Sequence, residues 1–160
     1  MSDPATTHWR ITIDDLTGPE ITDLLTRHRA QMADNSPACS MHALDLTGLR
    51  DPAVTVWSAW SGTNLVGCGA LRELAAAHGE IKSMRTAAGH TGRGVGAAIL
   101  AHLVATGRQR GYRRVSLETG SSAFFAPARR LYRRHGFAEC GPFAEYVLDP
   151  NSRFFTLELG

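Results

Sequence analysis

The chain has 160 residues, of which 43% are apolar and 20% are charged, a length and a balance typical of one globular domain and not of a disordered chain. Its net charge of +2 is too small to indicate a nucleic-acid-binding protein, and no window approaches the roughly 18 apolar residues of a membrane span. Three cysteines without a close pair argue against a disulfide framework and against a zinc site, and the N-terminus lacks the pattern of a secretory signal. We therefore expect a single cytoplasmic domain over residues 1–160, with no metal and no nucleic-acid or membrane partner.

The first half of the chain predicts a strand, two helices and then three strands. Alternating apolar and polar residues over 8–16 indicate the first strand, and Pro19 then stands at the start of a helix. The segment 36–52, bracketed by prolines, is interpreted as a second, short helix. Strand patterns follow at 54–62, 64–74 and 79–86, with a hairpin turn between the first two.

The second half predicts a strand–helix–strand crossover. A helix is expected from about Val95 to Arg110, because its apolar positions form one stripe. A strand follows at 113–120, then a helix from about Pro127 that ends at Gly136, and last strands within 137–146 and 153–159. The predicted fold is mixed α/β: a mostly antiparallel sheet of six or seven strands with a central β-α-β crossover and about four helices.

A glycine-rich loop precedes the central helix. Gly92, Gly94 and Gly96 surround Arg93; glycines allow positive φ and let backbone N–H groups approach a ligand. Because the following helix adds unpaired N–H groups and a partial positive charge, the loop predicts a phosphate site. The Gly-Lys-Ser/Thr ending of a P-loop is absent. The dinucleotide fingerprint is matched by Gly92, Gly94 and Ala97, but it follows a meander and not the first strand of a repeated βαβ pattern. A nicotinamide-dependent oxidoreductase therefore stands only as an alternative.

Several segments together carry a family resemblance. "EIKSMRT" before the loop, "ARRLYRRHGF" after it, and "SLETGS", "CGPF" and "DPNSRF" around them resemble the GNAT superfamily of acetyl-CoA-dependent N-acetyltransferases, and within it the small bacterial YsnE-type branch. The resemblance covers nearly the whole chain. It implies acetyl-CoA as co-substrate, no metal, and a chain that is able to pair as a homodimer.

The resemblance also implies where the coenzyme binds. Its diphosphate would lie against the backbone of 91–97, although Thr91 stands where the family usually has Arg or Gln. The strand before the loop would bind the pantetheine arm, and the N–H of Met84 or Arg85 would polarise the thioester carbonyl. Phe125 replaces an asparagine that faces the arm in many relatives. The implied coenzyme-binding residues are Met84, Arg85, Thr86, Thr91, Gly92, Arg93, Gly94, Val95, Gly96, Ala97, Phe125, Ala128 and Tyr132.

Proton transfer and acceptor binding are assigned in the same way. Tyr132 occupies the position of the family tyrosine that serves the departing thiolate, although it could instead only pack its helix onto the sheet. Glu80 stands where several members carry a base, with Glu118 as its rival and a strand-end surface charge as the structural alternative for Glu80. Lys82 shares the Glu80 face by alternation and could hold an acceptor carboxylate or be solvated. The expected acceptor site comprises Glu80, Lys82, Glu118, Thr119, Phe143 and Tyr146.

These assignments predict transfer of acetyl to a primary amine of a small molecule, such as an amino acid or a related carboxylate, by direct attack in a ternary complex. The alternative from another class is a regulatory domain that binds acetyl-CoA or CoA without catalysis.

Overall fold

One seven-stranded sheet organises residues 9–160, the part of the chain that the computed structural model describes. The strand order is β1-β2-β3-β4-β5-β7-β6. Neighbouring strands are antiparallel except for β4 and β5, which α3 joins as a parallel pair. The strands are β1 (Arg10–Ile13), β2 (Val54–Ser61), β3 (Asn64–Ala75), β4 (His78–Thr86), β5 (Arg114–Gly120), β6 (Ala138–Cys140) and β7 (Ser152–Glu158), and the helices are α1 (Pro19–Asn35), α2 (Leu46–Leu49), α3 (Val95–Gln109) and α4 (Ala126–Arg134). The predicted mixed sheet, its crossover and its four helices are confirmed.

Two predicted elements are wrong in detail. The segment 36–52 is not one helix: a short 3-10 turn at Ala38–Ser40 is followed by extended chain and then by α2. Asp45 explains the break, because its carboxylate accepts a hydrogen bond from the N–H of Gly48 at 2.8 Å and so caps the start of a separate helix. The segment 137–146 forms a strand only at β6, since Gly141 and Pro142 end the strand pattern.

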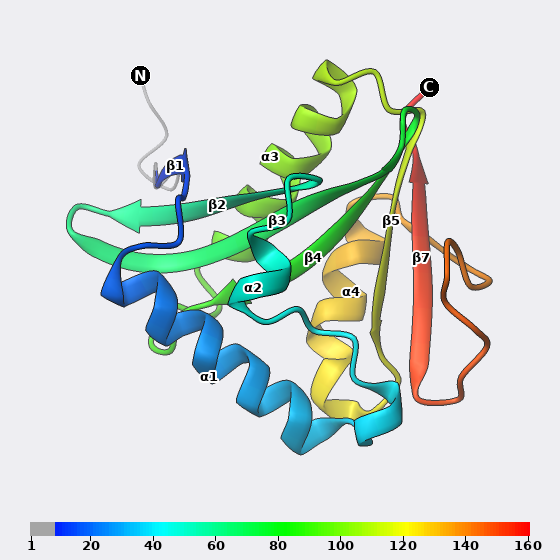
Figure 1. Cartoon of the computed structure of the whole chain (residues 1–160), viewed down its shortest axis with the longest axis horizontal. Coiled ribbons are helices and arrows are strands. Elements are labelled where there is room, and N and C mark those ends of the chain that lie inside the picture. Colours follow the sequence, from blue (N-terminus) through cyan, green and yellow to red (C-terminus); the bar gives the residue numbers. More distant parts are fainter. Residues whose placement is uncertain (1–8) are drawn as a thin grey trace.

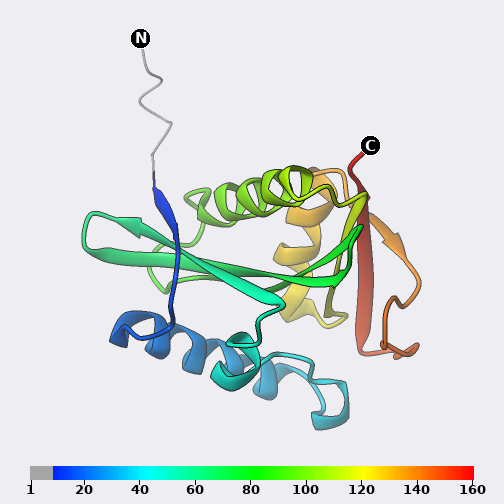
Figure 2. The same cartoon turned by 45° about the horizontal axis from the view of Figure 1, so that its top comes forward.

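Helices cover both faces of the sheet (Figure 2). α3 and α4 pack on one face in a cluster that includes Ile99, Leu103 and Phe155. α1 and α2 pack on the opposite face, where α1 contributes its apolar stripe against Cys68 and Ala70 of β3. Burying each large apolar side chain stabilises the fold by about 1.5–3 kcal/mol, so the sheet is fixed between two independent apolar layers. Within residues 9–160, no helix combines the length and hydrophobicity that crossing a membrane requires.

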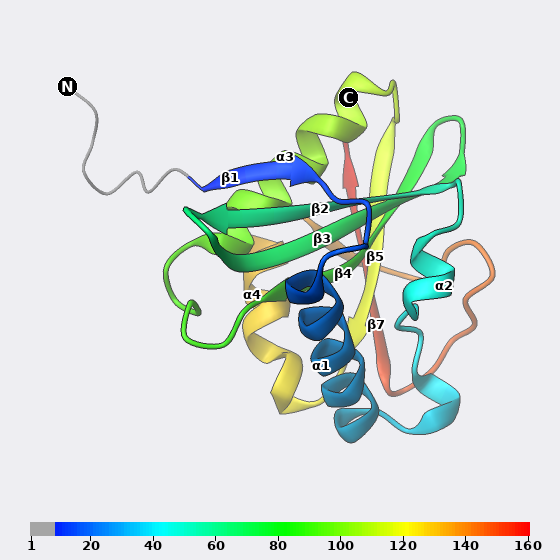
Figure 3. The same ribbon diagram turned by 60° about the vertical axis from the view of Figure 1, so that its left-hand side comes forward.

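The parallel pair at the centre of the sheet is incomplete. β4 pairs with β5 only from His78 to Ile81, opposite 114–117, and beyond this point the two strands diverge (Figure 1). A bulge lies in the diverging part of β4, where Ser83 and Met84 together stand opposite a single residue of β3. Ser83 has a positive φ of 54°. The sheet is therefore open between the ends of β4 and β5, and Figure 3 shows α1 in front of this opening.

Candidate active site

A cavity of about 700 Å³ occupies the opening between β4 and β5. Its walls are the second half of β4, the end of β5, one side of α1, the segment 36–43, the loop before α3, the first turn of α3, and one side of α4. It reaches both faces of the sheet, since α1 lies on one face and α3 and α4 lie on the other. A molecule bound here would be in contact with both layers of the fold.

The glycine loop forms one end of the cavity. Gly92 and Gly94 have φ of 75° and 87°, values that residues with a Cβ adopt only with strain. Gly94 is also the N-cap of α3, whose first turn carries no acidic side chain. The unpaired N–H groups and positive dipole end of this helix therefore border the cavity, an arrangement suited to a phosphate. Of the predicted residues 91–97, all line the cavity except Arg93, which is exposed beside it.

Gly96 has a different role in the same helix. A Cβ at this position would lie 3.3 Å from Cδ2 of Leu131 in α4, closer than most such contacts. The missing side chain therefore lets α4 pack tightly against the start of α3, which brings the helix that carries Tyr132 to the glycine loop.

The bulge in β4 decides which way its side chains point. Lys82 and Arg85 pair with Ala70 and Cys68, which face α1, so both side chains are on the α1 side although the two residues are three positions apart. Met84 packs with the α3 cluster on the opposite side. All three residues and Thr86 line the cavity, and Met84, Arg85 and Thr86 are among the residues for which the resemblance implies coenzyme binding.

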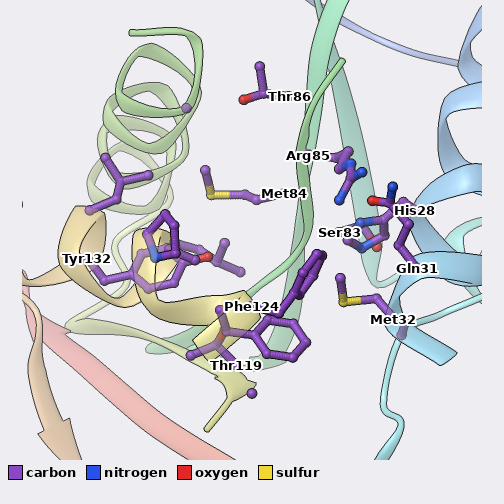
Figure 4. A pocket seen from close by; sticks show the side chains of 18 of the residues that line it. His28, Gln31, Met32, Ser83, Met84, Arg85, Thr86, Thr119, Phe124 and Tyr132 are labelled. Carbon is purple, nitrogen blue, oxygen red and sulfur yellow. The ribbon is translucent and has the colours of Figure 1, made fainter. Parts of the chain in front are cut away.

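Tyr132 projects from α4 into the cavity (Figure 4). Its ring packs beside Phe137 and Phe155, with centroids 6.0 and 6.1 Å away. Burial, followed by the negative charge of Glu118, raises the pKa of Tyr132 to about 12. The phenol is therefore protonated at neutral pH and is able to donate a hydrogen bond. Ala128 and Phe125 line the cavity nearby.

Glu118 contributes the one acidic side chain of the cavity lining in the described part of the chain. It lies near the end of β5 and is followed by Thr119, which also lines the cavity. Burial is the main cause that raises the pKa of Glu118 to about 7. Near neutral pH this carboxyl group exchanges readily between its neutral and charged forms, as a general base must.

Glu80 lies elsewhere. Its side chain is 2% exposed, and its Oε2 lies 3.3 Å from Nζ of Lys82 and accepts a hydrogen bond from the hydroxyl of Tyr146. Tyr146 stacks edge-on against Phe143, with centroids 5.0 Å apart. Neither Glu80, Tyr146 nor Phe143 is part of the lining that the structure describes. Of the predicted acceptor residues, Lys82, Glu118 and Thr119 line the cavity, whereas Glu80 and Phe143 are buried and Tyr146 is half-buried outside its lining.

The α1 wall contains residues that sequence reasoning missed. His28, Gln31 and Met32 of α1, with Ser83 of β4, line the side of the cavity opposite Tyr132 (Figure 4). Burial, and secondarily the charge of Arg85, lowers the pKa of His28 to about 4. A signal for this residue exists in the sequence, because His28 continues the apolar stripe that begins with Ile21, and a histidine on a buried helix face is a candidate for a site.

The chain matches a known family over most of its length. Residues 20–137 fit the acetyltransferase (GNAT) family. The chain belongs to the GNAT family. This GNAT protein is also 54% identical over 149 residues to YsnE of Bacillus subtilis, an uncharacterised N-acetyltransferase, covering 93% of this chain and 99% of YsnE. It is 50% identical over 149 residues to YedL of Escherichia coli, another uncharacterised N-acetyltransferase, covering 93% and 94% of the two chains. The predicted YsnE-type resemblance is confirmed, and the protein is an acyltransferase.

Solved structures share the same architecture. An acyl-CoA N-acyltransferase, so described, from Klebsiella pneumoniae superposes with a TM-score of 0.80 at 30% identity, covering 98% of this chain and 99% of that one. A Bacillus subtilis acetyltransferase in complex with CoA has a TM-score of 0.71 at 17% identity, covering 94% and 99%. The second likeness establishes the shared fold alone.

Proposed function

We propose that this GNAT acetyltransferase transfers the acetyl group of acetyl-CoA to the primary amine of a small molecule, by direct attack in a ternary complex. The observation that carries the proposal is the joining of the glycine loop, Glu118 and Tyr132 in one cavity. An anion site, a group able to accept a proton and a group able to donate one are the parts that this reaction needs.

The α3 side of the cavity is the proposed coenzyme site. The diphosphate would contact the backbone N–H groups of 91–97, where positive φ at Gly92 and Gly94 shapes the loop. The pantetheine arm would follow the diverging half of β4 beside Met84 and Tyr132. The bulge in β4 supports this placement, because the extra residue of a bulge interrupts the hydrogen bonds of the strand. The solved relative in complex with CoA is consistent with this choice of ligand.

The two proton movements are divided between the two faces of the sheet. The amine nitrogen attacks the thioester carbonyl, a C–N bond forms, and the Glu118 carboxylate takes the proton that the nitrogen loses. The C–S bond then breaks, and the Tyr132 hydroxyl donates a hydrogen bond to the departing thiolate. A backbone N–H at the bulge, that of Met84 or Arg85, would stabilise the oxyanion between these steps.

The positions of the cysteines favour direct attack over an acetyl-enzyme intermediate. Residues 9–160 include all three of them, and none lines the cavity. Cys68 is fully buried, and burial raises the pKa of its thiol to about 12, so it is not a thiolate at neutral pH.

Calorimetry and thiol release test the proposal together. We expect acetyl-CoA to bind and NAD not to bind, and we expect release of CoA when members of a panel of small primary amines are added. Binding of NAD in place of acetyl-CoA would overturn the proposal. Binding of acetyl-CoA without turnover of any amine would instead favour the regulatory domain that binds the coenzyme.

A further inference from the structure

An unpaired cation lies on the α1 wall of the cavity. The Arg85 side chain is half-buried and lines the cavity. Within residues 9–160 its guanidinium has no carboxylate within ion-pair distance. A half-buried guanidinium normally has a partner, because burial disfavours an isolated charge.

Two further polar groups beside Arg85 also have no partner. Oγ of Ser83 and Nδ1 of His28 are buried without a hydrogen bond in the described part of the chain, and His28 is 7% exposed. Both residues line the cavity, and Figure 4 shows them next to Arg85 on the wall opposite Tyr132. Leaving a buried polar group unpaired costs about 1–3 kcal/mol. A guanidinium, a hydroxyl and an imidazole that converge without partners form a site for an anion with several acceptor atoms.

Lys82 does not compete for this role. Its ammonium lies 3.3 Å from the Glu80 carboxylate and 3.0 Å from the Tyr146 hydroxyl, and its side chain is 8% exposed. Of the two cations that β4 places on the α1 side, Arg85 is the one that reaches the cavity without a partner. This shifts the expected carboxylate-binding residue from Lys82 to Arg85.

The position of the site identifies its ligand. The diphosphate of the coenzyme would lie at the glycine loop on the α3 side, whereas Arg85 faces α1 across the opening of the sheet. The wall around Arg85 also carries the apolar side chains of Met32, Met41 and Phe124, next to polar ones such as Gln31 and His42. We infer that Arg85, with Ser83 and His28, binds the carboxylate of an acceptor that combines a primary amine, a carboxylate and an apolar body. This inference rests on the proposed acetyl transfer and names the acceptor class.

Matched acceptors test the inference. L-Phenylalanine and L-leucine would be compared with 2-phenylethylamine and 3-methylbutylamine, which lack only the carboxylate, by measuring kcat/KM from thiol release. We expect the carboxylate to raise kcat/KM at least tenfold. Arg85→Gln should lower kcat/KM for the amino acids by about 10- to 100-fold, as expected for loss of a charge-assisted pair. It should lower kcat/KM for the amines by less than threefold. Arg85→Lys should recover part of the loss. Arg27→Gln, which changes an exposed arginine of α1, is the control and should match the wild type.

Binding measurements separate this inference from the proposed function. Calorimetry on the CoA-loaded protein would compare N-acetyl-L-phenylalanine with N-acetyl-2-phenylethylamine, so the anion site is tested even without turnover. Equal affinity for the two probes, or an unchanged preference in Arg85→Gln, would overturn the carboxylate site while leaving acetyl transfer intact.

Loss of acetyl-CoA affinity by tenfold in Arg85→Gln would assign Arg85 to the coenzyme. A specific gain with succinyl-CoA over acetyl-CoA that depends on Arg85 would assign the carboxylate to the acyl group, and either result would overturn the acceptor site.

Discussion

Lys82 and Glu80 form a buried ion pair, with Nζ of Lys82 3.3 Å from Oε2 of Glu80 and the two side chains 8% and 2% exposed. The hydroxyl of Tyr146 donates to the same carboxylate and completes the group. This arrangement satisfies Glu80 within the fold, outside the residues that line the cavity, and we therefore propose Glu118 and not Glu80 as the base.

Replacing Glu80 should therefore affect stability more than chemistry. Glu80→Gln leaves the buried Lys82 ammonium without its counter-charge, which typically costs about 3–5 kcal/mol. Urea denaturation should show this loss, while kcat/KM of the folded protein should fall by less than tenfold. A variant of full stability whose kcat is nearly abolished would instead make Glu80 the base.

Titration of Glu118 should cause the fall of kcat/KM on the acidic side of the pH profile. Because burial raises its pKa to about 7, the carboxylate form that accepts a proton is lost as the pH falls below that value. We expect kcat/KM to rise with pH up to about 7 through this group, with the acceptor amine titrating separately at higher pH. Glu118→Gln should lower kcat/KM by about 10²-fold and remove this acidic limb of the profile. An unaltered limb in the variant would assign it to another group.

Tyr132→Phe isolates the hydroxyl of the proposed thiolate donor. The ring contacts with Phe137 and Phe155 remain, so folding should be preserved. We expect kcat to fall by about 10²-fold and the Kd for acetyl-CoA, measured by calorimetry, to stay within threefold. An unchanged kcat would leave Tyr132 a packing residue only.

The glycine loop should tolerate a Cβ in one place and not in another. Gly92→Ala and Gly94→Ala force a side chain into positive φ, at about 1–2 kcal/mol, and distort the backbone that lines the cavity. We expect acetyl-CoA affinity to fall at least tenfold in both. Gly89 has a similar φ of 84° and is not among the lining residues, so Gly89→Ala should lose comparable stability and keep its affinity. Equal affinity losses in all three variants would point to general loosening of the loop.

Sequence patterns predicted the elements that have regular periodicity. The strand patterns of β2, β3 and β4 and the apolar stripe of α3 predict these elements, and the structure agrees with them. β2 and β3 have runs of four and six consecutive buried residues, because helices cover both faces of the sheet. Alternation also placed Glu80 and Lys82 on one face of β4, as the ion pair confirms.

The remaining features depend on local geometry that the sequence does not display. The bulge at Ser83 shifts the alternation of β4 and turns Arg85 to the α1 side, where strict alternation from Lys82 would place Met84. The segment 141–151 has no periodic pattern. The expected acceptor site contained both Tyr146 and Glu80, but the sequence did not indicate that the Tyr146 hydroxyl would donate a hydrogen bond to the Glu80 carboxylate. The capping carboxylate of Asp45 likewise divides a segment that composition alone presents as one helix.

A crystal structure of the protein with acetyl-CoA tests the central claim most directly. We predict the diphosphate against the backbone N–H groups of 91–97, the acetyl carbonyl beside the bulge at Met84, and the thioester sulfur within hydrogen-bond reach of the Tyr132 hydroxyl. Acetyl-CoA seated away from the opening between β4 and β5, or turned so that its thioester lies far from both Tyr132 and Glu118, would contradict the account.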